Sequence, residues 1–398
     1  MSTFADMQCE RHFKDLYRKD PDSLIFCPYR VCPIGAHSDK NLGAVTGMAL
    51  DKGIYLAYSP KHNGVIELCS LQFEKRAQWH VAQILGARQN DWADYLRGAC
   101  LALSRKYPVH TGLSGVIEGT LPIGGLSSSA AVTLVFLNAL CSVNGISPTP
   151  AELIGFSISA ENDYVGVNSG KLDQSCEMYC RKDHLLYLDT LTDEYELIPT
   201  SPIMKPYEIA VFFSGVERNL VGSKYNMRID ESRSAAYALK AFSGMEYGKF
   251  DETCLRDVPR EVFERYKDRL PENWRKRATH WYSEFDRVQK GAEAWRKGDI
   301  EEYGRLCFES GHSSIYNWET GSPELKAMYD IMTGIDGIYG GRFSGAGFKG
   351  CCMALIDPSY RESVLEKVKT EYLALFPNLA GSYKAMVCQN SDGLTGRL

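Results

Sequence analysis

The chain is organised around one stretch of sequence, Gly124-Gly125-Leu126-Ser127-Ser128-Ser129-Ala130-Ala131-Val132-Thr133-Leu134. Its two glycines permit backbone angles and close approaches that a Cβ atom would forbid. The apolar run that continues to Ala139 predicts a buried helix. A turn that leads into the N-terminus of a helix offers several N–H groups and the positive end of the helix dipole to one anion, which is most often a phosphate.

The three serines of this turn allow two interpretations. Their hydroxyls can add hydrogen bonds to a phosphate and place one oxygen on a hard cation such as Mg²⁺. A serine is also among the commonest N-caps of an ordinary core helix, which needs no ligand. The stretch is not a Walker A motif, because no lysine follows the glycines ahead of a serine or threonine. Both interpretations stay open at this point.

Length and composition predict a globular protein of two domains. The 398 residues are 44% hydrophobic and 24% charged, with a formal net charge of −5 and acidic and basic residues mixed throughout. No basic stripe indicates nucleic acid, and no basic amphipathic helix or long apolar run indicates a membrane. The first residues lack the pattern of a signal peptide, and the thirteen cysteines include no C-x-x-C pair. We therefore expect reduced thiols and a cytoplasmic protein.

Hydrophobic periodicity predicts the secondary structure along the chain. Helices are expected at 4–19, 92–107, 130–139, 148–163, 169–179, 223–241, 274–295, 301–313, 323–333 and 361–376. Strands are expected at 24–35, 45–58, 65–73, 112–117, 184–189, 209–213, 351–356 and 382–388. Within 45–58, the polar Asp51-Lys52-Gly53 predicts a turn.

A change in pattern near Thr200-Ser201-Pro202 predicts a domain boundary, with one domain at 1–203 and a second at 204–398. Each half mixes strands and helices without strict alternation, which favours two α+β domains. The highly charged residues 245–270 predict a helical excursion at the surface. The pair Cys351-Cys352 is typical of small core residues in a strand, although a reactive or regulatory pair has the same sequence.

A second glycine-rich element is Gly341-Arg342-Phe343-Ser344-Gly345-Ala346-Gly347-Phe348-Lys349-Gly350. Alone it is typical of a loop that joins two strands. Because its small residues let the backbone approach a ligand closely, the two glycine-rich elements together indicate one nucleotide held between two halves of the protein.

Three charged residues are candidates for the chemistry. Asp173 stands where a polar turn enters an apolar element, a place where an acid can act as a general base toward a hydroxyl. Glu161 is a candidate for holding magnesium. Arg30, before Gly35 at the end of a strand, can pair with Asp173, keep it ionised and face the charge of a transferring phosphoryl group. Taken singly, each acid is more often a solvated or capping residue, and His37 is more often an ordinary loop or core imidazole.

The order of these elements resembles the galactokinases, a group of the GHMP small-molecule kinases. Arg30-(x)4-Gly35-Ala36-His37-Ser38-Asp39-(x)3-Gly43 is similar to R-V-N-L-I-G-E-H-T-D-Y-N-x-G. Residues 122–131 resemble the phosphate loop P-x-G-x-G-L-S-S-S-A-A, and 341–350 resemble the third motif G-A-R-x-T-G-A-G-F-G-G-C. Leu172-Asp173-Gln174 is similar to M-D-Q, and Tyr225-Asn226-Met227-Arg228 to E-Y-x-x-R-R. The galacturonokinase branch, with R-I-C-P-L-G-A-H, is the most similar branch.

The resemblance implies a fold and a set of roles. The fold is a two-domain α+β architecture, with an N-terminal part like domain 2 of ribosomal protein S5 and a ferredoxin-like C-terminal part. The activity is phosphorylation by ATP, with Mg²⁺, of the anomeric C1 hydroxyl of a hexose-type sugar. Asp173 matches the catalytic aspartate and Arg30 the arginine beside it. The remaining matches are Gly124, Gly125, Leu126, Ser127, Ser128 and Ser129 for phosphate, Ser129 and Glu161 for magnesium, and Ala36, His37, Asp39, Lys40, Tyr225 and Gly345 for the sugar.

Three departures from the galactokinase pattern bear on the substrate. The phosphate loop is one residue short, and the tyrosine of H-T-D-Y is Lys40. The glutamate of G-E-H, which takes the 6-hydroxyl of the sugar in galactokinases, is Ala36. Because two carboxylates facing each other in a partly buried pocket repel, the loss of this glutamate favours a uronic acid, with galacturonate before glucuronate.

Other functions remain open on the sequence alone. These are a galactokinase, a kinase of another pyranose such as an amino sugar, and a galactokinase-like sensor that binds sugar and ATP without turnover. The sugar motif argues against a decarboxylase of the same superfamily. We expect a small sugar or sugar acid as partner, neither nucleic acid nor membrane, and a monomer or small homo-oligomer.

Overall fold

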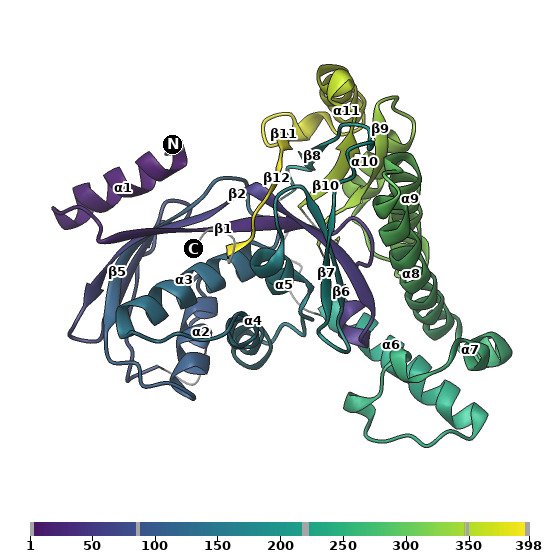
Figure 1. Ribbon diagram of the computed structural model, residues 1–398, viewed down its shortest axis with the longest axis horizontal. Coiled ribbons are helices and arrows are strands. Elements are labelled where there is room, and N and C mark those ends of the chain that lie inside the picture. The colour runs from purple at the N-terminus through teal and green to yellow at the C-terminus, as the bar shows by residue number, and fades with distance from the viewer. Residues whose placement is uncertain (1–3, 85–87, 217–222, 346, 348–349, 395–398) are drawn as a thin grey trace.

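The structure is a computed structural model that describes residues 4–84, 88–216, 223–345, 347 and 350–394. Two sheets, each covered by helices, form its two parts (Figure 1). The larger sheet holds most of the first half of the chain, and the smaller sheet holds the second half. Helices and mainly antiparallel strands share each part, which confirms the predicted α+β class.

The larger sheet has eight strands among the described residues, in the order β4-β3-β5-β2-β6-β7, with β1 and β12 also paired to β2. Of the strand pairs that the described residues form in this sheet, only β3 and β5 run parallel. The strands are β1 (Ser23–Val31), β2 (Ala44–Lys61), β3 (Val65–Ser70), β4 (Ala77–His80), β5 (Gly112–Gly119), β6 (His184–Asp189), β7 (Tyr195–Pro199) and β12 (Asn390–Ser391).

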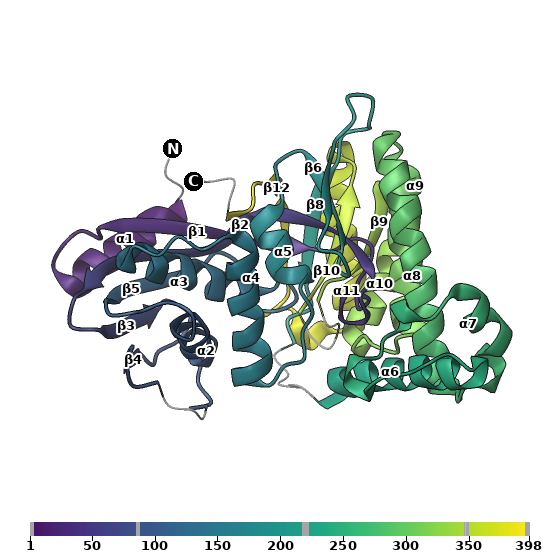
Figure 2. The same cartoon turned by 60° about the horizontal axis from the view of Figure 1, so that its bottom comes forward.

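Helices cover both faces of this sheet. Helix α1 (Phe4–Tyr17) packs on one face through the buried Cys9 and Phe13. The other face carries α2 (Asp94–Ser104), α3 (Ser128–Asn144), α4 (Pro150–Ser159) and α5 (Leu172–Tyr179), as Figures 1 and 2 show. Helix α3 is buried nearly all round because it lies between the sheet and its neighbouring helices, which explains why its sequence is apolar throughout.

The smaller sheet has the antiparallel order β11-β8-β10-β9. Its strands are β8 (Glu208–Phe213), β9 (Ile338–Phe343), β10 (Cys351–Ile356) and β11 (Lys384–Cys388). Four of the helices between them are α8 (Glu272–Arg296), α9 (Ile300–Tyr316), α10 (Pro323–Thr333) and α11 (Arg361–Leu375). This succession is the β-α-β-β-α-β pattern of ferredoxin-like folds. Cys351 and Cys352 are both fully buried in β10, as expected of core residues.

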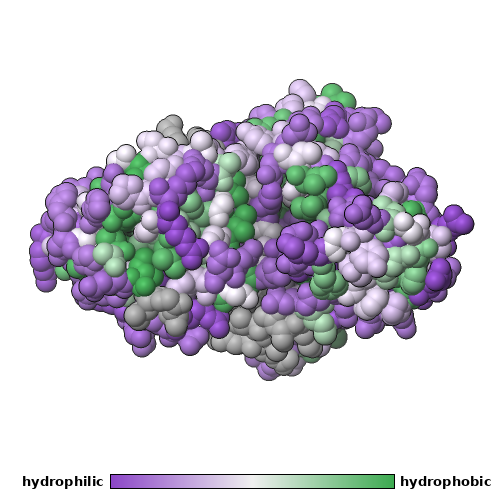
Figure 3. Space-filling model, turned by 90° about the horizontal axis from the view of Figure 1, so that it is seen from below, coloured by the Kyte–Doolittle hydropathy of each residue, from purple (hydrophilic) through white to green (hydrophobic). Residues whose placement is uncertain are grey.

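The charged segment 245–270 forms one short helix, α7 (Arg260–Tyr266), and three short 3₁₀ turns. It is less helical than the sequence predicts, and it is not a free excursion. Its buried Leu255, Val258 and Phe263 pack with α6 (Ser223–Ser243) and α8 in a separate hydrophobic cluster. Figure 3, which views the molecule from below, shows apolar residues in small patches framed by polar side chains.

The predicted turn at residues 51–53 is wrong. Strand β2 runs without a break from Ala44 to Lys61. Asp51 and Lys52 lie where its pairing with β1 shifts register, between Pro28 and Arg30 of β1. Gly53 is required there for another reason, because a Cβ atom would lie 2.1 Å from the carbonyl oxygen of Cys27. Neighbouring strands pair with β2 on both of its edges, and the polarity of residues 51–53 alone does not predict this pairing.

Other features also differ from the sequence prediction. Strands β4, β7, β9 and β12 are absent from it, and β1 ends at Val31 rather than at residue 35. The thirteen cysteines are all free, as expected, and twelve of them are buried. Within the described part of the chain, no helix is both long and apolar enough to cross a membrane. The domain limits at 203 and 204 stay a prediction.

Candidate functional site

The serine turn joins β5 to α3 and lies against the second glycine-rich loop. Gly124 and Gly125 have φ angles of 139° and 82°, which side chains rarely adopt. A Cβ atom on Gly124 would lie 3.0 Å from the Cα atom of Gly350, and one on Gly345 would lie 3.1 Å from the carbonyl oxygen of Gly125. The two glycine-rich loops therefore meet backbone to backbone, as the sequence indicates. Ala346, Phe348 and Lys349 of the second loop lie outside the described residues.

Ser127 occupies the N-cap position of α3, but its side chain makes no capping hydrogen bond. Its φ angle is 64°, in the left-handed region. Its hydroxyl instead donates to Oδ2 of Asp173 at 2.7 Å. The interpretation of this serine as an ordinary cap is thus wrong. Its side chain leaves the N–H groups in the first turn of α3 uncapped.

Asp173, in the first turn of α5, is paired with Arg30 of β1 across 143 residues of sequence. Nε and Nη2 of Arg30 both lie 2.7 Å from Oδ1 of Asp173. Arg30 is 3% exposed, and its Nη1 also donates to the carbonyl oxygen of Gly125 at 3.1 Å and to Oγ of Ser344 at 3.3 Å. Burial opposes the charge of Arg30, yet the Asp173 carboxylate raises its pKa above the ordinary value. One guanidinium therefore ties the aspartate to both glycine-rich loops.

A cavity of about 350 Å³ opens between these loops. Arg30, Ser129 and Asp173 all line it, so the structure brings together three residues that are far apart in the sequence. Phe73 and Trp92 line another part of the wall, with parallel rings whose centroids are 5.8 Å apart. No motif in the sequence marks these two aromatic residues. The remaining predicted residues on the wall are Gly124, Gly125, Ser127, Ser128 and Gly345.

Glu161 lies in a π-helical turn, Ala160–Val165, that follows α4. Such turns are frequent at functional sites. Its Oε2 accepts hydrogen bonds from Ser169 at 2.6 Å and from Gln174 at 3.0 Å. Burial and the nearby Asp173 raise the pKa of Glu161, while the Ser129 hydroxyl acts in the opposite direction. A carboxylate next to a serine hydroxyl is a donor set of oxygens that suits Mg²⁺, which usually binds through few protein ligands together with phosphates.

The sugar motif forms a buried loop between β1 and β2. Oδ2 of Asp39 accepts a hydrogen bond from the backbone N–H of Leu172 at 3.3 Å, which places this carboxyl beside the residue preceding Asp173. Burial, and then Asp173, raise the pKa of Asp39. Nζ of Lys40 lies 3.4 Å from the carbonyl oxygen of Ser169, and burial and Arg233 lower its pKa. Asp39, Lys40 and Arg233 line a second cavity of about 240 Å³.

His37 and Tyr225 lie side by side at this loop. Their ring centroids are 6.5 Å apart, and the His37 ring is stacked on Trp318 at 5.3 Å. His37 is 5% exposed, has a φ angle of 66° and leaves its Nε2 without a hydrogen-bond partner in the described structure. Burial, and then Arg342 and His280, lower its pKa well below the ordinary value, so the ring is neutral. Burial raises the pKa of Tyr225.

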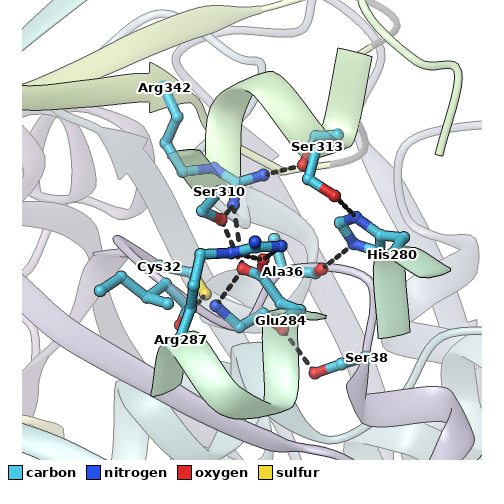
Figure 4. A network of polar contacts seen from close by, with 12 residues as sticks. Cys32, Ala36, Ser38, His280, Glu284, Arg287, Ser310, Ser313 and Arg342 are labelled. Carbon is cyan, nitrogen blue, oxygen red and sulfur yellow. Dashed lines mark hydrogen bonds and ion pairs between the residues drawn. The ribbon is translucent and has the colours of Figure 1, made fainter. Parts of the chain in front are cut away.

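Helix α8 holds the Gly35-Ala36 turn from the other half of the protein (Figure 4). Oε1 of Glu284 accepts a hydrogen bond from the N–H of Gly35 at 2.6 Å, and Nε2 of His280 lies 3.0 Å from the carbonyl oxygen of Ala36. Glu284 in turn binds Arg287 and Ser310, and Ser310 binds Arg342 of β9. Sequence reasoning missed His280 and Glu284, because a buried polar residue on an amphipathic helix carries no local signal, and it missed Trp318, which follows the end of α9 and lies in no motif.

Comparisons with known proteins agree with this geometry. The GHMP kinases N-terminal domain matches residues 94–181, the GHMP kinases C-terminal region matches 292–374, and the galactokinase galactose-binding signature matches 11–60. The chain is 38% identical to galacturonokinase from Arabidopsis thaliana, over 93% of this chain and 92% of that protein. It is 30% identical to galactokinase from Roseiflexus sp. (strain RS-1), over 97% and 96% of the two chains.

Solved structures show the same fold. Lactococcus lactis galactokinase complexed with galactose matches with a TM-score of 0.87 at 26% identity, over 96% of this chain and 97% of that chain. Methanococcus jannaschii mevalonate kinase matches with a TM-score of 0.64 at 14% identity, over 93% and 98%. The predicted two-domain GHMP kinase fold is thus confirmed, and ATP is the expected phosphoryl donor because GHMP kinases use ATP. The chain belongs to the GHMP kinase family and is a galactokinase-like sugar kinase.

Proposed function

We propose that this protein transfers the γ-phosphoryl group of ATP to the anomeric hydroxyl of galacturonic acid. The observation that supports the reaction best is the position of Asp173. It is held at one oxygen by Arg30 and at the other by Ser127, on the wall of the cavity that the serine turn also lines. A base placed beside an anion site is what phosphoryl transfer to a hydroxyl requires.

In this mechanism Asp173 accepts the proton of the C1 hydroxyl as the bond between O1 and the γ-phosphorus forms. The bond between that phosphorus and the bridging oxygen breaks, and ADP leaves with the electron pair. Arg30 and the N–H groups at the start of α3 stabilise the charge that spreads over the transferring group. Ser129 and Glu161 would hold Mg²⁺, which when bound supplies positive charge to the phosphates. Phe73 and Trp92 provide flat apolar surfaces for the base of the nucleotide.

The choice of a uronic acid rests on the surroundings of Ala36. At this position the galactokinase pattern has a glutamate, and a second carboxylate facing that of the sugar would be repelled. Ala36 carries no charge, and Glu284, the acid that α8 brings to this turn, is already engaged by the N–H of Gly35, by Ser310 and by Arg287. Lys40 and Arg233 bring two positive charges to the second cavity, which Asp39, Asp251 and Glu252 also line. The 38% identity to a galacturonokinase supports the same choice.

Steady-state kinetics on galacturonate, glucuronate and galactose test the substrate. We expect the highest kcat/KM for galacturonate, and we expect Ala36→Glu to lower kcat/KM for galacturonate by at least tenfold while raising it for galactose. Lys40→Gln should raise KM for galacturonate more than for galactose, whereas Lys290→Gln, on the exposed side of α8, should change neither. A wild-type preference for galactose or another pyranose would overturn the uronate proposal, and binding without ATP consumption would indicate a sensor.

Asp173→Asn tests the base independently of the choice of sugar. General-base catalysis contributes about 10²–10⁴-fold, so kcat should fall by about that factor. The nucleotide dissociation constant should change far less, because the asparagine side chain keeps an acceptor for Ser127 and the serine turn is intact. Full activity in a correctly folded Asp173→Asn protein would exclude the proposed mechanism.

A further inference from the structure

Glu177 is a second carboxyl close to Asp173 that the mechanism above does not use. The two residues are four positions apart in α5 and therefore lie on the same face of the helix. Glu177 is fully buried, and neither of its carboxyl oxygens has a hydrogen-bond partner within the described structure. An ionised carboxylate in such a place would cost several kcal/mol, because the hydroxyl near it, that of Ser127, donates to Asp173 and does not replace the water that Glu177 loses.

The groups around Glu177 come from several elements. Asp173 acts on it from its own helix, Arg30 from β1, and Glu161 from the π-helical turn, while the hydroxyl of Ser127 is the nearby polar group of the serine turn. Burial first, and then the negative charge of Asp173, raise the pKa of Glu177 well above its ordinary value, although Arg30 and the Ser127 hydroxyl oppose this. The only positive charge of this set is already shared with Asp173.

The other elements that pack on α5 do not compensate the charge. Strand β1 also brings Tyr29, whose buried hydroxyl has no partner in the described structure. Helix α4 has one acidic residue, Glu152, which is bound to Lys106 and Tyr107 on the far side. The two charged residues in the middle of β2, Asp51 and Lys52, pair with each other, and Asp51 also accepts a hydrogen bond from the N–H of Gln389.

We propose that Glu177 is a positioning residue that works as an uncharged acid, leaving Asp173 as the only negative partner of Arg30. Ionisation of Glu177 then sets the alkaline limit of catalysis. A second negative charge one helical turn from Asp173 would compete for Arg30, whose Nε and Nη2 fix Oδ1 of the base. It would also repel the incoming triphosphate at the serine turn. This inference rests on the proposed function for the role of Asp173.

The variant Glu177→Gln tests the proposal, because the amide has the size of the acid and never ionises. At neutral pH we expect kcat within threefold of the wild type. At alkaline pH the wild-type kcat should decline, and Glu177→Gln should shift that decline upward by at least one pH unit. Glu324→Gln, a substitution of another buried glutamate at the start of α10, is the matched control and should leave the pH profile unchanged.

Thermal unfolding gives a readout that does not depend on the activity. In the unfolded chain Glu177 ionises above about pH 4.5, whereas the folded protein keeps its proton, so the wild type loses stability as the pH rises from there. The Tm of Glu177→Gln minus that of the wild type should therefore increase from pH 4.5 to pH 8.

The outcomes separate this proposal from the proposed function. A flat Tm difference means that Glu177 is ionised in the folded protein, which overturns the proposal. An increasing Tm difference with an unchanged alkaline limit of kcat also overturns it, since Glu177 is then neutral but without effect on catalysis. Loss of activity at neutral pH in a folded Glu177→Gln protein would show that the carboxylate is needed as an anion. Full activity of Asp173→Asn would instead refute the proposed function and leave the Tm result intact.

Discussion

Ser127 combines two unusual properties at one residue. Its backbone is in the left-handed region, with a φ angle of 64°, and its hydroxyl donates to Oδ2 of Asp173 instead of capping α3. A left-handed conformation costs a non-glycine residue on the order of 1 kcal/mol. The left-handed backbone and the hydrogen bond to Asp173, the proposed base, are two separate properties, and substitutions at this residue can distinguish their effects.

We expect Ser127→Ala and Ser127→Gly each to lower kcat by about tenfold, because both remove the hydrogen bond to Asp173, worth about 1.5–3 kcal/mol for a charged acceptor. Only Ser127→Gly relieves the strain, so its free energy of unfolding should exceed that of Ser127→Ala by about 1 kcal/mol. Steady-state kinetics and urea unfolding of the pair measure both effects. Equal kcat in the wild type and both variants would show that the hydroxyl does not orient Asp173.

At the scale of elements, α9 rests on β9 through two glycines. A Cβ atom on Gly304 would lie 2.1 Å from the carbonyl oxygen of Tyr339, and one on Gly340 would lie 2.0 Å from the carbonyl oxygen of Gly304. The helix and the strand are therefore in backbone contact, with no room for a side chain between them. This contact fixes α9, and with it Ser310 and Ser313, against the Arg342 side of the site.

Gly304→Ala should lower the free energy of unfolding by about 2 kcal/mol or more, because the backbones must separate to admit the methyl group. Gly155→Ala is the matched control, since Gly155 is an exposed residue of α4 and a Cβ atom there would meet nothing within 4 Å. That substitution should stabilise the protein by about 0.5–1 kcal/mol through helix propensity. Urea unfolding measures both, and equal stability of the two variants would contradict the backbone contact.

The contact of α8 with the Gly35-Ala36 turn makes the protein sensitive to acid. Burial lowers the pKa of His280 from 6.5 to about 4, so the folded protein keeps this imidazole neutral. Below pH 6.5 the unfolded chain binds a proton there that the folded protein does not bind. Stability should therefore fall as the pH drops from 6.5 to 4, by about 3 kcal/mol at about 1.36 kcal/mol per pKa unit.

Thermal unfolding between pH 7 and pH 4 checks this expectation. His280→Gln can still donate to the carbonyl oxygen of Ala36 but does not titrate, so its Tm should fall less steeply over this range. His312→Gln, on the exposed side of α9, serves as the control and should follow the wild type. If His280→Gln and the wild type lose stability in parallel, the buried imidazole is not the source of the acid sensitivity.

For the whole molecule, the two parts are joined by a common core and by the end of the chain. Ile209 of β8 and Trp295 of α8 belong to the same hydrophobic cluster as Met48 of β2. Strand β12 returns to pair with β2, and Asn390 accepts a hydrogen bond from the N–H of Asp183 at 2.9 Å. We expect the two sheets to stabilise each other, so that a substitution in β12 lowers the free energy of unfolding of the whole protein.

Asn390→Ala removes this bond and the one that Asn390 donates to the carbonyl oxygen of His184 at 3.1 Å. It should lower the free energy of unfolding by about 1–3 kcal/mol, because two backbone groups are left without partners. Asn63→Ala, in the turn between β2 and β3, removes one exposed bond and should cost less than half as much. Urea unfolding followed at two wavelengths compares them, and an unaffected Asn390→Ala protein would show that β12 adds nothing to stability.

The sequence predicts most of the elements of this fold for identifiable reasons. Helix α3 is predicted by its apolar run, and α4 is predicted by the capping box that Thr149 and Glu152 form at its start. The short strands β4, β7 and β12 give no such signal, because two to five residues carry too little periodicity and depend on a partner strand. The false turn at 51–53 has the same cause, since its pairing with β1 and with the end of the chain outweighs local polarity.

The features of the candidate site also fall into those that the local sequence predicts and those that depend on distant segments. By its own pattern the sequence indicated the serine turn and the second glycine-rich loop and suggested that Arg30 can pair with Asp173, because glycines and hydroxyls ahead of an apolar run favour an anion site and opposite charges attract. Only the tertiary structure decided that Ser127 orients Asp173 rather than capping a helix, that His280 and Glu284 hold the sugar motif from the other half, and that Glu177 is buried without a partner. These features arise from contacts between distant segments, and the local sequence around a residue does not show which distant residues it will contact.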